Sequence, residues 1–296
     1  NTSAYQLVES YLEMIPLGAK LNVDPAFRIS IDTTKPGSPN DTFIMSFNGA
    51  GFDAVINWGD GTEQSITGSP GDVTHVYSEP GVYSVSVAGI IYQVSFFNKT
   101  DVLKLLSIDN WGDNAWISLL TSFYGTTNLK YVTNGPINLD LFPNTTNMFA
   151  ISGITEIDMR KWYNLTSLSS IFNSCFDLES INLTGVDTSN ITSYYRAFRA
   201  CPKLKGDFSF LSIKSVSDLR EMFTSADINE TNTTTNYDNT LVSFANQAEL
   251  YNKTGLNFHG GNSKYSATGQ VARNLLTTPV IDGGYGWTIT DGGLAV

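Results

Sequence analysis

NLTSLSSIFNSCFDL (residues 164–178) and NITSYYRAFRACPKL (residues 190–204) are two copies of one pattern, each built around a phenylalanine. The same phenylalanine recurs five times in the middle of the chain, with gaps of 26, 23, 26 and 25 residues. Gaps of this size are the period of a structural repeat, because helices and strands repeat over far fewer residues. The five residues are Phe123, Phe149, Phe172, Phe198 and Phe223.

The neighbours of each phenylalanine keep their chemical type from copy to copy. Apolar side chains stand seven residues before it and, in most copies, four residues before it. These spacings place three apolar side chains on one face of a short helix. A small residue follows three positions later, and a leucine or isoleucine follows five or six positions later. The pattern therefore predicts one short helix, a tight turn and one short strand in each unit.

A single unit cannot cover its own apolar stripe, so neighbouring units must stack into a solenoid with a shared core. The two quoted stretches resemble the BspA-like leucine-rich repeats of bacterial surface proteins and phage proteins. SVSDLREMFTSADI (residues 215–228) is a looser copy, and PNTTNMFAISGI (residues 143–154) is one residue short after its phenylalanine. The resemblance implies a BspA-like leucine-rich-repeat solenoid over residues 99–239.

Residues 26–98 show a strand pattern instead, with alternating apolar residues between turns, as in FRISIDT. Asp60-Gly61 is a hairpin signal, because glycine adopts positive φ without steric cost. The segments NWGDGT, THVY and PGVYSVSVAG follow one another as in the PKD-type immunoglobulin-like β-sandwich, which this region resembles. The resemblance implies a spacer or interaction module without catalytic activity. We interpret Asp60 as the cap of its own turn rather than a calcium ligand, and His75 as a packed strand residue.

DVLKLLSIDNWGD, the segment that connects the two predicted domains, contains no flexible linker. We therefore expect the first solenoid strand to pair with the sandwich, which would cap the N-terminal end of the solenoid. Residues 240–296 are predicted to form the C-terminal cap of the solenoid. One helix is expected near residues 240–250 and a second in YSATGQVARNLLTTP, with Val271, Leu275 and Leu276 on one apolar face. The ending GWTITDGG resembles the terminal segment of such repeat proteins.

Residues 1–25 form an N-terminal segment of different character. Ala4, Val8, Tyr11 and Ile15 are spaced by four, three and four residues, which predicts an amphipathic helix that ends at Pro16. One interpretation is an attachment or oligomerisation helix that docks through Val8, Tyr11 and Ile15. The other is a helix packed on the first domain.

Composition and charge exclude several classes of protein. The length of 296 residues favours about two domains. The net charge of −11, with basic residues scattered singly, disfavours a nucleic-acid or anionic-membrane surface. No apolar run approaches the roughly 20 residues that cross a bilayer. Cys175 and Cys201 occupy the same slot of consecutive repeats, and we favour buried free thiols over a disulfide.

No catalytic or cofactor motif is found in the sequence. His75 and His259 fall in different predicted domains, so neither a histidine-rich metal site nor a Ser-His-Asp triad can be assembled. No cofactor and no metal are therefore expected. Asn164 and Asn190 belong to Asn-x-Ser/Thr sequons, but each stands eight residues before its repeat phenylalanine, at the expected N-cap of the predicted helix. We interpret them as helix caps rather than glycosylation sites.

The sequence thus predicts an α+β protein in which a PKD-like β-sandwich is followed by a short BspA-like solenoid and its cap. The predicted function is that of a non-catalytic, surface-exposed architectural or recognition protein. We expect a virion component, such as a phage head fibre, capsid decoration or tail-fibre protein, that contacts a host surface glycan or protein. A bacterial cell-surface adhesin is the alternative, and a glycan depolymerase built on paired carboxylates is the second alternative.

Its expected partners are other virion or surface proteins, bound through the N-terminal segment, and the host surface. Attachment through the N-terminal segment would include the association of identical copies of the chain into a symmetric homo-oligomer. Aromatic and polar residues at variable repeat positions are the candidate contacts with the host. They are Tyr131, Trp162, Tyr163, Tyr195 and Arg199.

Overall fold

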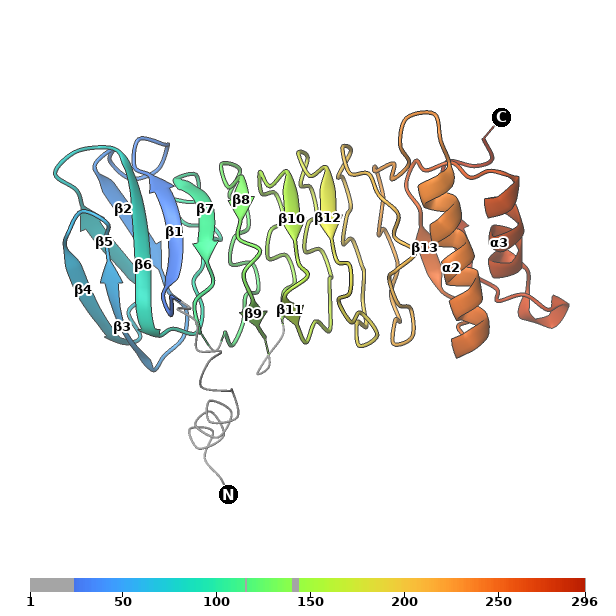
Figure 1. The fold of residues 1–296 in the computed structure, drawn as a ribbon, viewed down its shortest axis with the longest axis horizontal. Helices are drawn as coiled ribbons and strands as arrows, with labels where there is room; N and C mark the ends of the chain where they lie inside the picture. The colour runs from blue at the N-terminus through green and yellow to red at the C-terminus, as the bar shows by residue number, and fades with distance from the viewer. Residues whose placement is uncertain (1–23, 115, 140–143, 296) are drawn as a thin grey trace, which may run out of the picture.

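The computed structural model describes residues 24–114, 116–139 and 144–295, which combine many short strands with two α-helices. This mixed content agrees with the predicted α+β class. Figure 1 shows three parts in a row: paired sheets at one end, a stack of narrow coils in the middle, and the two helices at the other end. The predicted N-terminal helix, with Val8, Tyr11 and Ile15, lies outside the described residues.

The first part contains two sheets whose strands alternate between buried and exposed residues. Phe27, Ile29 and Ile31 of the first strand are fully buried, as expected when successive side chains point to opposite faces. The larger sheet has the order β4-β3-β6-β1-β7-β8, and β2 pairs with β5 in a separate sheet. The first six strands are β1 (Phe27–Asp32), β2 (Thr42–Ser46), β3 (Phe52–Asn57), β4 (Glu63–Gly68), β5 (Asp72–Val76) and β6 (Val82–Ile90).

Strand β7 (Leu105–Asn110) connects the sheets to the coils. It pairs antiparallel with β1, where Ile108 lies opposite Ile29, and parallel with β8 (Tyr131–Val132), the first strand of the repeats. The six-stranded sheet therefore includes strands from both sides of the join. The expected pairing of the first solenoid strand, which is β7, with the preceding sheet is confirmed.

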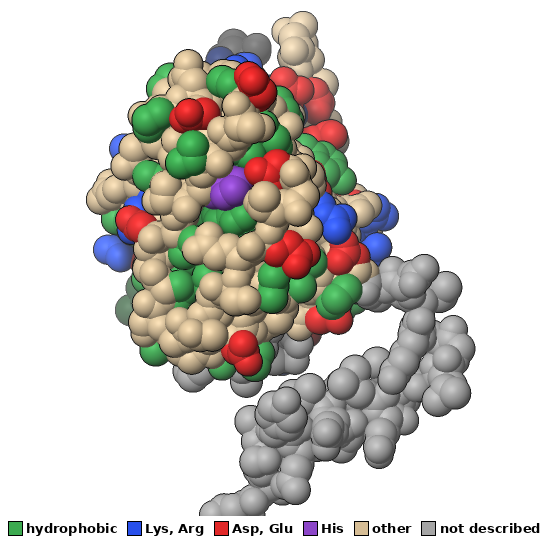
Figure 2. Space-filling model, turned by 90° about the vertical axis from the view of Figure 1, so that its left-hand side faces the viewer, with side chains coloured by type: hydrophobic (Ala, Val, Ile, Leu, Met, Phe, Trp, Pro, Cys, Tyr) green, Lys and Arg blue, Asp and Glu red, His purple; other side chains and the backbone are tan. Residues whose placement is uncertain are grey.

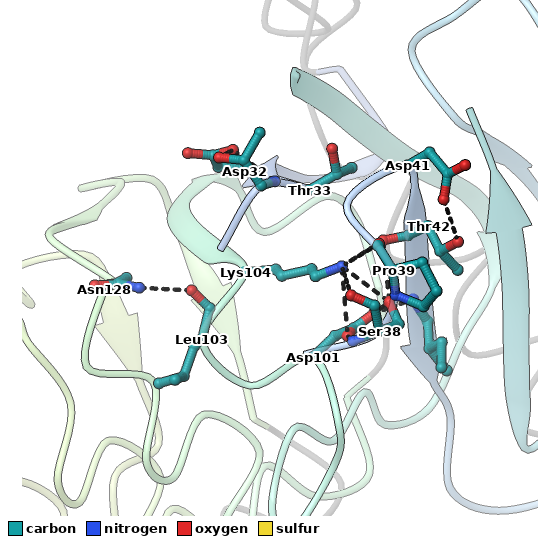
Figure 3. Close-up of polar contacts among 12 residues, drawn as sticks. Asp32, Thr33, Ser38, Pro39, Asp41, Thr42, Asp101, Leu103, Lys104 and Asn128 are labelled. Carbon is teal, nitrogen blue, oxygen red and sulfur yellow. Dashed lines mark hydrogen bonds and ion pairs between the residues drawn. The ribbon is translucent and has the colours of Figure 1, made fainter. Parts of the chain in front are cut away.

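A buried ion pair stabilises the same connection between the sheets and the coils (Figure 3). Lys104 and Asp101 both have fully buried side chains, with Nζ 3.8 Å from Oδ1. The Lys104 ammonium donates to the carbonyl oxygens of Ser38 and Thr42 at 2.9 and 2.7 Å, and Asp101 accepts from the N–H groups of Ser38 and Ile44 at 2.7 and 2.6 Å. Burial lowers the pKa of Lys104, although Asp101 acts in the opposite direction. The loop between β1 and β2 is thereby tied to the start of β7.

Each repeat forms a coil in which the phenylalanine lies in a run of turns rather than a helix. The backbone N–H of Ser122 donates to the Leu119 carbonyl of its own coil, whereas that of Phe123 donates to Met148 of the next coil. An α-helix would direct every N–H to the carbonyl four residues earlier in the same segment. The predicted short helix in each unit is therefore wrong, because every second N–H bonds across to the neighbouring coil.

The backbone conformation explains how the turns keep a helix-like spacing. The residues two before and two after each phenylalanine have positive φ, for example Thr121 at 55° and Gly125 at 79° in the first coil. In the second coil Asn147 and Ile151 have φ of 54° and 59°. A non-glycine residue pays about 1–2 kcal/mol for this left-handed conformation. The same pattern continues in Ser170, Ser174, Arg196, Ala200, Glu221 and Ser225.

The five repeat phenylalanines form one buried ladder, as predicted. All five are fully buried, and adjacent ring centroids lie 5.4 to 6.1 Å apart in near-parallel stacks. The ladder extends beyond the repeats, since Phe96 stacks on Phe123 at 6.0 Å and Phe258 meets Phe223 at 6.4 Å. One hydrophobic core therefore runs from the sheets through the coils into the C-terminal part.

The capping side chain of each coil stands five residues before the phenylalanine, not eight. The side-chain oxygen of Asn144 accepts a hydrogen bond from the Thr146 N–H at 3.1 Å. The prediction that Asn164 and Asn190 cap helices is wrong, because turns and not a helix begin after each of them. The equivalent caps in the other coils are Ser118, Ser167, Ser193 and Asp218.

Cys175 and Cys201 are buried free thiols, as the sequence favoured. The Cys175 thiol donates to the Phe149 carbonyl at 3.0 Å, and that of Cys201 donates to the Phe172 carbonyl at 3.1 Å. Burial raises the pKa of Cys175 to about 11. Both side chains fill the small-residue slot and bond back to the preceding coil.

The coils also carry short parallel strand pairs. Strand β9 (Ile137–Asn138) pairs with β11 (Trp162–Tyr163), and β10 (Glu156–Asp158) pairs with β12 (Ser180–Asn182). Backbone bonds between coils continue where no strand is assigned, for example from Lys205 to Glu179.

The last part contains α2 (Thr235–Tyr251), β13 (Asn257–His259), α3 (Ala267–Thr277), the 3-10 turn η1 (Val280–Asp282) and β14 (Thr288–Thr290). Strands β13 and β14 pair parallel, and the Phe223 N–H donates to the His259 carbonyl, so β13 continues the stack. Both helices expected in this region are present. No helix in the described part of the chain is long and apolar enough to cross a membrane.

The predicted apolar face of α3 is wrong in part. Leu276 is fully buried, but Val271 and Leu275 are 73% and 40% exposed. The buried face is formed instead by Gly269 and Ala272 together with Leu276. These small residues let α3 approach α2 closely, since a side chain at Gly269 would collide with Asp238.

Candidate functional site

A groove of about 400 Å³ opens over the strands of the first three coils, β8, β10 and β12. Strand β7 pairs with β8, and β10 pairs with β12, but among the described residues no strand pairing joins β8 to β10. The second coil is also one residue short between its phenylalanine and the isoleucine that follows, Phe149 to Ile154, as is the fifth coil, Phe223 to Ile228. The groove therefore lies where the ladder of strands is interrupted.

Equivalent positions of neighbouring strands supply the groove's side chains. Glu156 lies in register with Ser180, and Tyr131 occupies the corresponding first position of β8. The next residues inward, Val132 and Ile157, are only 5% and 3% exposed. Because strand side chains alternate between faces, the groove is lined by the outward set, and the apolar set anchors it to the core.

Four of the polar side chains in the groove have no hydrogen-bond partner within the described part of the chain. They are Tyr131, which is 56% exposed, and Asn134, Glu156 and Ser180. Asn182 also lines the groove, and its Oδ1 accepts from the Thr184 N–H while its Nδ2 donates to no described group. The groove thus offers one aromatic ring and a set of unpaired hydroxyl, amide and carboxylate groups.

The charged residues at the groove's edges are mostly paired. The Arg160 guanidinium donates hydrogen bonds to both carboxylate oxygens of Asp158, with Nη2 2.6 Å from Oδ2. These hydrogen bonds lower the pKa of Asp158. Lys130 lies 3.1 Å from Asp177. Glu156 is therefore the carboxylate of the groove that has no cationic partner among the described residues.

The structure separates the predicted contact residues. Tyr131 lies in the groove, and Tyr163, 53% exposed, lies on β11 outside it. The prediction of Trp162 as a contact is wrong, since it is 2% exposed and packs on Trp111 and Phe149 at 5.9 and 6.3 Å. Trp162 and Tyr163 are consecutive in one strand, so only one of them can face outward.

Tyr195 and Arg199 are brought together in a charged cluster on the turns of the fourth and fifth coils. The guanidinium groups of Arg196 and Arg220 lie 4.8 and 5.2 Å from the centre of the Tyr195 ring. Glu221 accepts two hydrogen bonds of 2.9 Å from Arg196 and lies 3.2 Å from Arg199 Nε. The bonds from Arg196 lower the pKa of Glu221. These charges largely satisfy one another.

The Asp60 turn joins β3 to β4 at the sheet end of the molecule. Figure 2 shows this end, where acidic and hydrophobic side chains are scattered over the face and Lys and Arg side chains lie mainly at its rim. Asp60 Oδ1 accepts from the Thr62 N–H at 2.9 Å and from its hydroxyl at 2.6 Å, and Oδ2 lies 2.8 Å from His75 Nε2. Burial alone raises the pKa of Asp60, but the hydrogen bonds from Thr62 and His75 lower it to about 2. The prediction that Asp60 caps its own turn is confirmed.

His75 packs as the sequence indicated. Its ring stacks on Trp58 with centroids 4.7 Å apart and meets Tyr77 edge-on at 4.5 Å. Nowhere in the described ranges do three or more His, Cys, Asp or Glu side chains gather so as to hold a metal ion.

The sequence reasoning missed most of the groove, including Asn134, Glu156, Ser180 and Asn182. Each stands at or near the strand of its repeat. An alignment of the repeats on their phenylalanines, with one gap in the second copy, places Glu156 and Ser180 beside Tyr131. That alignment was the signal available for finding them.

Comparison with known proteins adds one match. Residues 117–237 match the model of a family described as "Mycoplasma protein of unknown function, DUF285". No curated protein and no solved structure matches the chain. The family match spans the coils and the start of α2 and leaves the two sheets outside it.

Proposed function

We propose that this chain is a non-catalytic, surface-exposed recognition protein that binds a host surface glycan or protein through the outward side of its coils. The observation that carries the proposal is the groove around Tyr131, with its exposed ring and unpaired polar side chains. These side chains stand on strands whose alternate residues are buried in a continuous core. A preformed site on a rigid scaffold suits recognition, because little order is lost on binding.

The proposed architecture has a PKD-like sandwich at residues 26–98, a BspA-like leucine-rich-repeat solenoid at residues 99–239 and its cap at residues 240–296. Two sheets with buried inner residues, a stack of coils with one phenylalanine each, and a terminal helical part support this division. Residues 1–25 are proposed as the attachment segment, through Val8, Tyr11 and Ile15.

The proposed location is the surface of a virion, as a head fibre, capsid decoration or tail-fibre component. The alternative is a bacterial cell surface, and the description of the matching family, which names Mycoplasma proteins, favours this alternative. Antibodies against the chain would distinguish the two. The first location predicts label on purified phage particles, and the second predicts label on the envelope of intact bacteria.

Recognition itself is tested with monomeric protein and with protein clustered on a multivalent support, each incubated with a panel of bacterial and animal cells. Weak contacts add through effective concentration, so the clustered form is expected to bind and the monomer to bind weakly. The supernatant is assayed for released sugar or peptide fragments. Fragment release would identify the depolymerase alternative, and absence of binding by either form would refute recognition.

A further inference from the structure

We propose that the ligand of the Tyr131 groove is a neutral glycan. One sugar ring packs against the ring of Tyr131, and the hydroxyl groups of the sugar form hydrogen bonds with Asn134, Glu156 and Asn182. This inference rests on the proposed recognition function and specifies its ligand.

The Tyr131 ring supplies the apolar contact. It is 56% exposed at the edge of a groove whose remaining outward side chains are polar. The face of an aromatic ring is electron-rich, so it attracts the C–H groups that line one face of a sugar ring. A single aromatic platform beside polar groups is suited to an amphipathic ligand, with an apolar face and a hydroxylated rim.

The polar groups of the groove are of the kind that bind hydroxyl groups. A side-chain amide both donates and accepts hydrogen bonds, a carboxylate accepts them at both oxygens, and a serine hydroxyl does either. Asn134, Glu156 and Ser180 have no partner in the described part of the chain, and Asn182 keeps its Nδ2 group available. Sugar hydroxyls, which donate and accept at once, can satisfy all of these groups.

Charge disfavours acidic glycans. The chain has a net charge of −11, and the groove itself contains Glu156 and Asp158. The groove's lysine, Lys130, lies 3.1 Å from Asp177, which it shares with Lys203 at 2.7 Å. A uronate or sialate would meet unpaired negative charge at Glu156, and it would have to compete with Asp177 for Lys130.

The burial of the apolar residues disfavours a peptide as the ligand. Peptides that bind as a helix in a groove or as a polyproline segment rely on apolar or aromatic pockets that receive anchor side chains. Val132 and Ile157, the apolar residues of the groove, are 5% and 3% exposed and face the core. The groove therefore presents no apolar pocket of this kind.

The test uses the full chain, clustered on a multivalent support, against a panel of immobilised neutral oligosaccharides, acidic oligosaccharides and peptides. Wild type is compared with Tyr131→Ala and with Tyr163→Ala as the matched control. Tyr163 is also exposed, at 53%, and also lies in a two-residue strand, but outside the groove. Loss of the stacked ring is expected to weaken neutral-glycan binding at least about tenfold, and the control is expected to change it less than about twofold.

Two further variants separate hydrogen bonding from charge. Glu156→Gln keeps a hydrogen-bonding side chain and is expected to retain binding within about threefold, whereas Glu156→Ala is expected to lose about tenfold. A cationic ligand would be lost with both variants, which would overturn the inference. Binding confined to acidic glycans or peptides, or equal binding by wild type and Tyr131→Ala, would also overturn it.

The outcomes distinguish this inference from the proposed function. If clustered wild type binds cells but Tyr131→Ala binds them equally well, the recognition function stands and the groove is refuted as its site. If clustered wild type binds no cells, the recognition function itself fails.

Discussion

Replacing Lys104 with methionine is expected to destabilise the protein strongly, because this lysine is the centre of the join between the sheets and the coils. Its side chain is fully buried, and its ammonium donates to the carbonyl oxygens of Ser38, Pro39 and Thr42 at 2.7 to 2.9 Å. Methionine has a similar length but cannot donate. The substitution would leave three buried acceptors without this donor and the Asp101 carboxylate without its neighbouring cation (Figure 3).

The magnitude follows from the burial of both partners. Removing one partner of a buried ion pair typically costs about 3–5 kcal/mol, because the remaining charge stays buried and uncompensated. The double variant Lys104→Met/Asp101→Asn is expected to cost less than the sum of the single variants, since it removes both charges. Each value is measured by urea unfolding of the full chain, followed by circular dichroism.

The matched control is Lys99→Met in the same join. Lys99 pairs with Asp72 at 2.7 Å, but the two side chains are 29% and 52% exposed. An exposed pair contributes about 0–1 kcal/mol, so this variant is expected to change stability by no more than that. If Lys104→Met changed the free energy of unfolding no more than Lys99→Met, the structural role assigned to the buried pair would be wrong.

Three further predictions concern the coils and the sheet end. Phe172→Ala should lower the free energy of unfolding by about 3–5 kcal/mol, whereas Phe176→Ala, at a 58% exposed position, should have little effect in the same urea titration. Equal stabilities of the two variants would mean that the residues assigned to the ladder are wrong. Ala200 has positive φ, which glycine adopts without strain, so Ala200→Gly should raise the melting temperature. Gly125 also has positive φ, so Gly125→Ala should lower it. Each change corresponds to about 1 kcal/mol, and opposite signs would contradict the left-handed turns. The pKa of Asp60 is lowered to about 2 in the folded state, so its stabilisation is present above its unfolded value near 4 and is lost as the pH falls toward 2. The stability advantage of wild type over Asp60→Asn should therefore be larger at pH 6 than at pH 2, and a difference independent of pH would refute this assignment.

The phenylalanine ladder was predictable because its period is set by one large residue that each coil must bury. Phe96 and Phe258 extend the ladder but were not found, since the residues around them do not repeat the flanking pattern. Spacing alone could not distinguish a helix from the observed turns. The difference depends on positive φ at residues such as Ile151, a β-branched side chain in which this conformation is rare and is not signalled by the sequence.

The candidate site was predictable only in part, because surface exposure depends on which way a strand faces. Tyr131 was found as an aromatic residue at a variable position, and the same reasoning selected Trp162, which the strand directs into the core. The groove's other residues come from separate coils, and the interruption between β8 and β10 that opens it is a property of packing between repeats. Such a feature has no specific local sequence signal, since the one-residue deletion of the second coil also occurs in the fifth.

The most direct test of non-catalytic recognition through the groove measures how much clustered protein is retained on cells, with the supernatant analysed in the same experiment. The account predicts that clustered wild type and Tyr163→Ala are retained, that clustered Tyr131→Ala is washed away, and that no sugar or peptide fragments are released. Retention of Tyr131→Ala equal to that of wild type, or release of fragments by wild type, would contradict it.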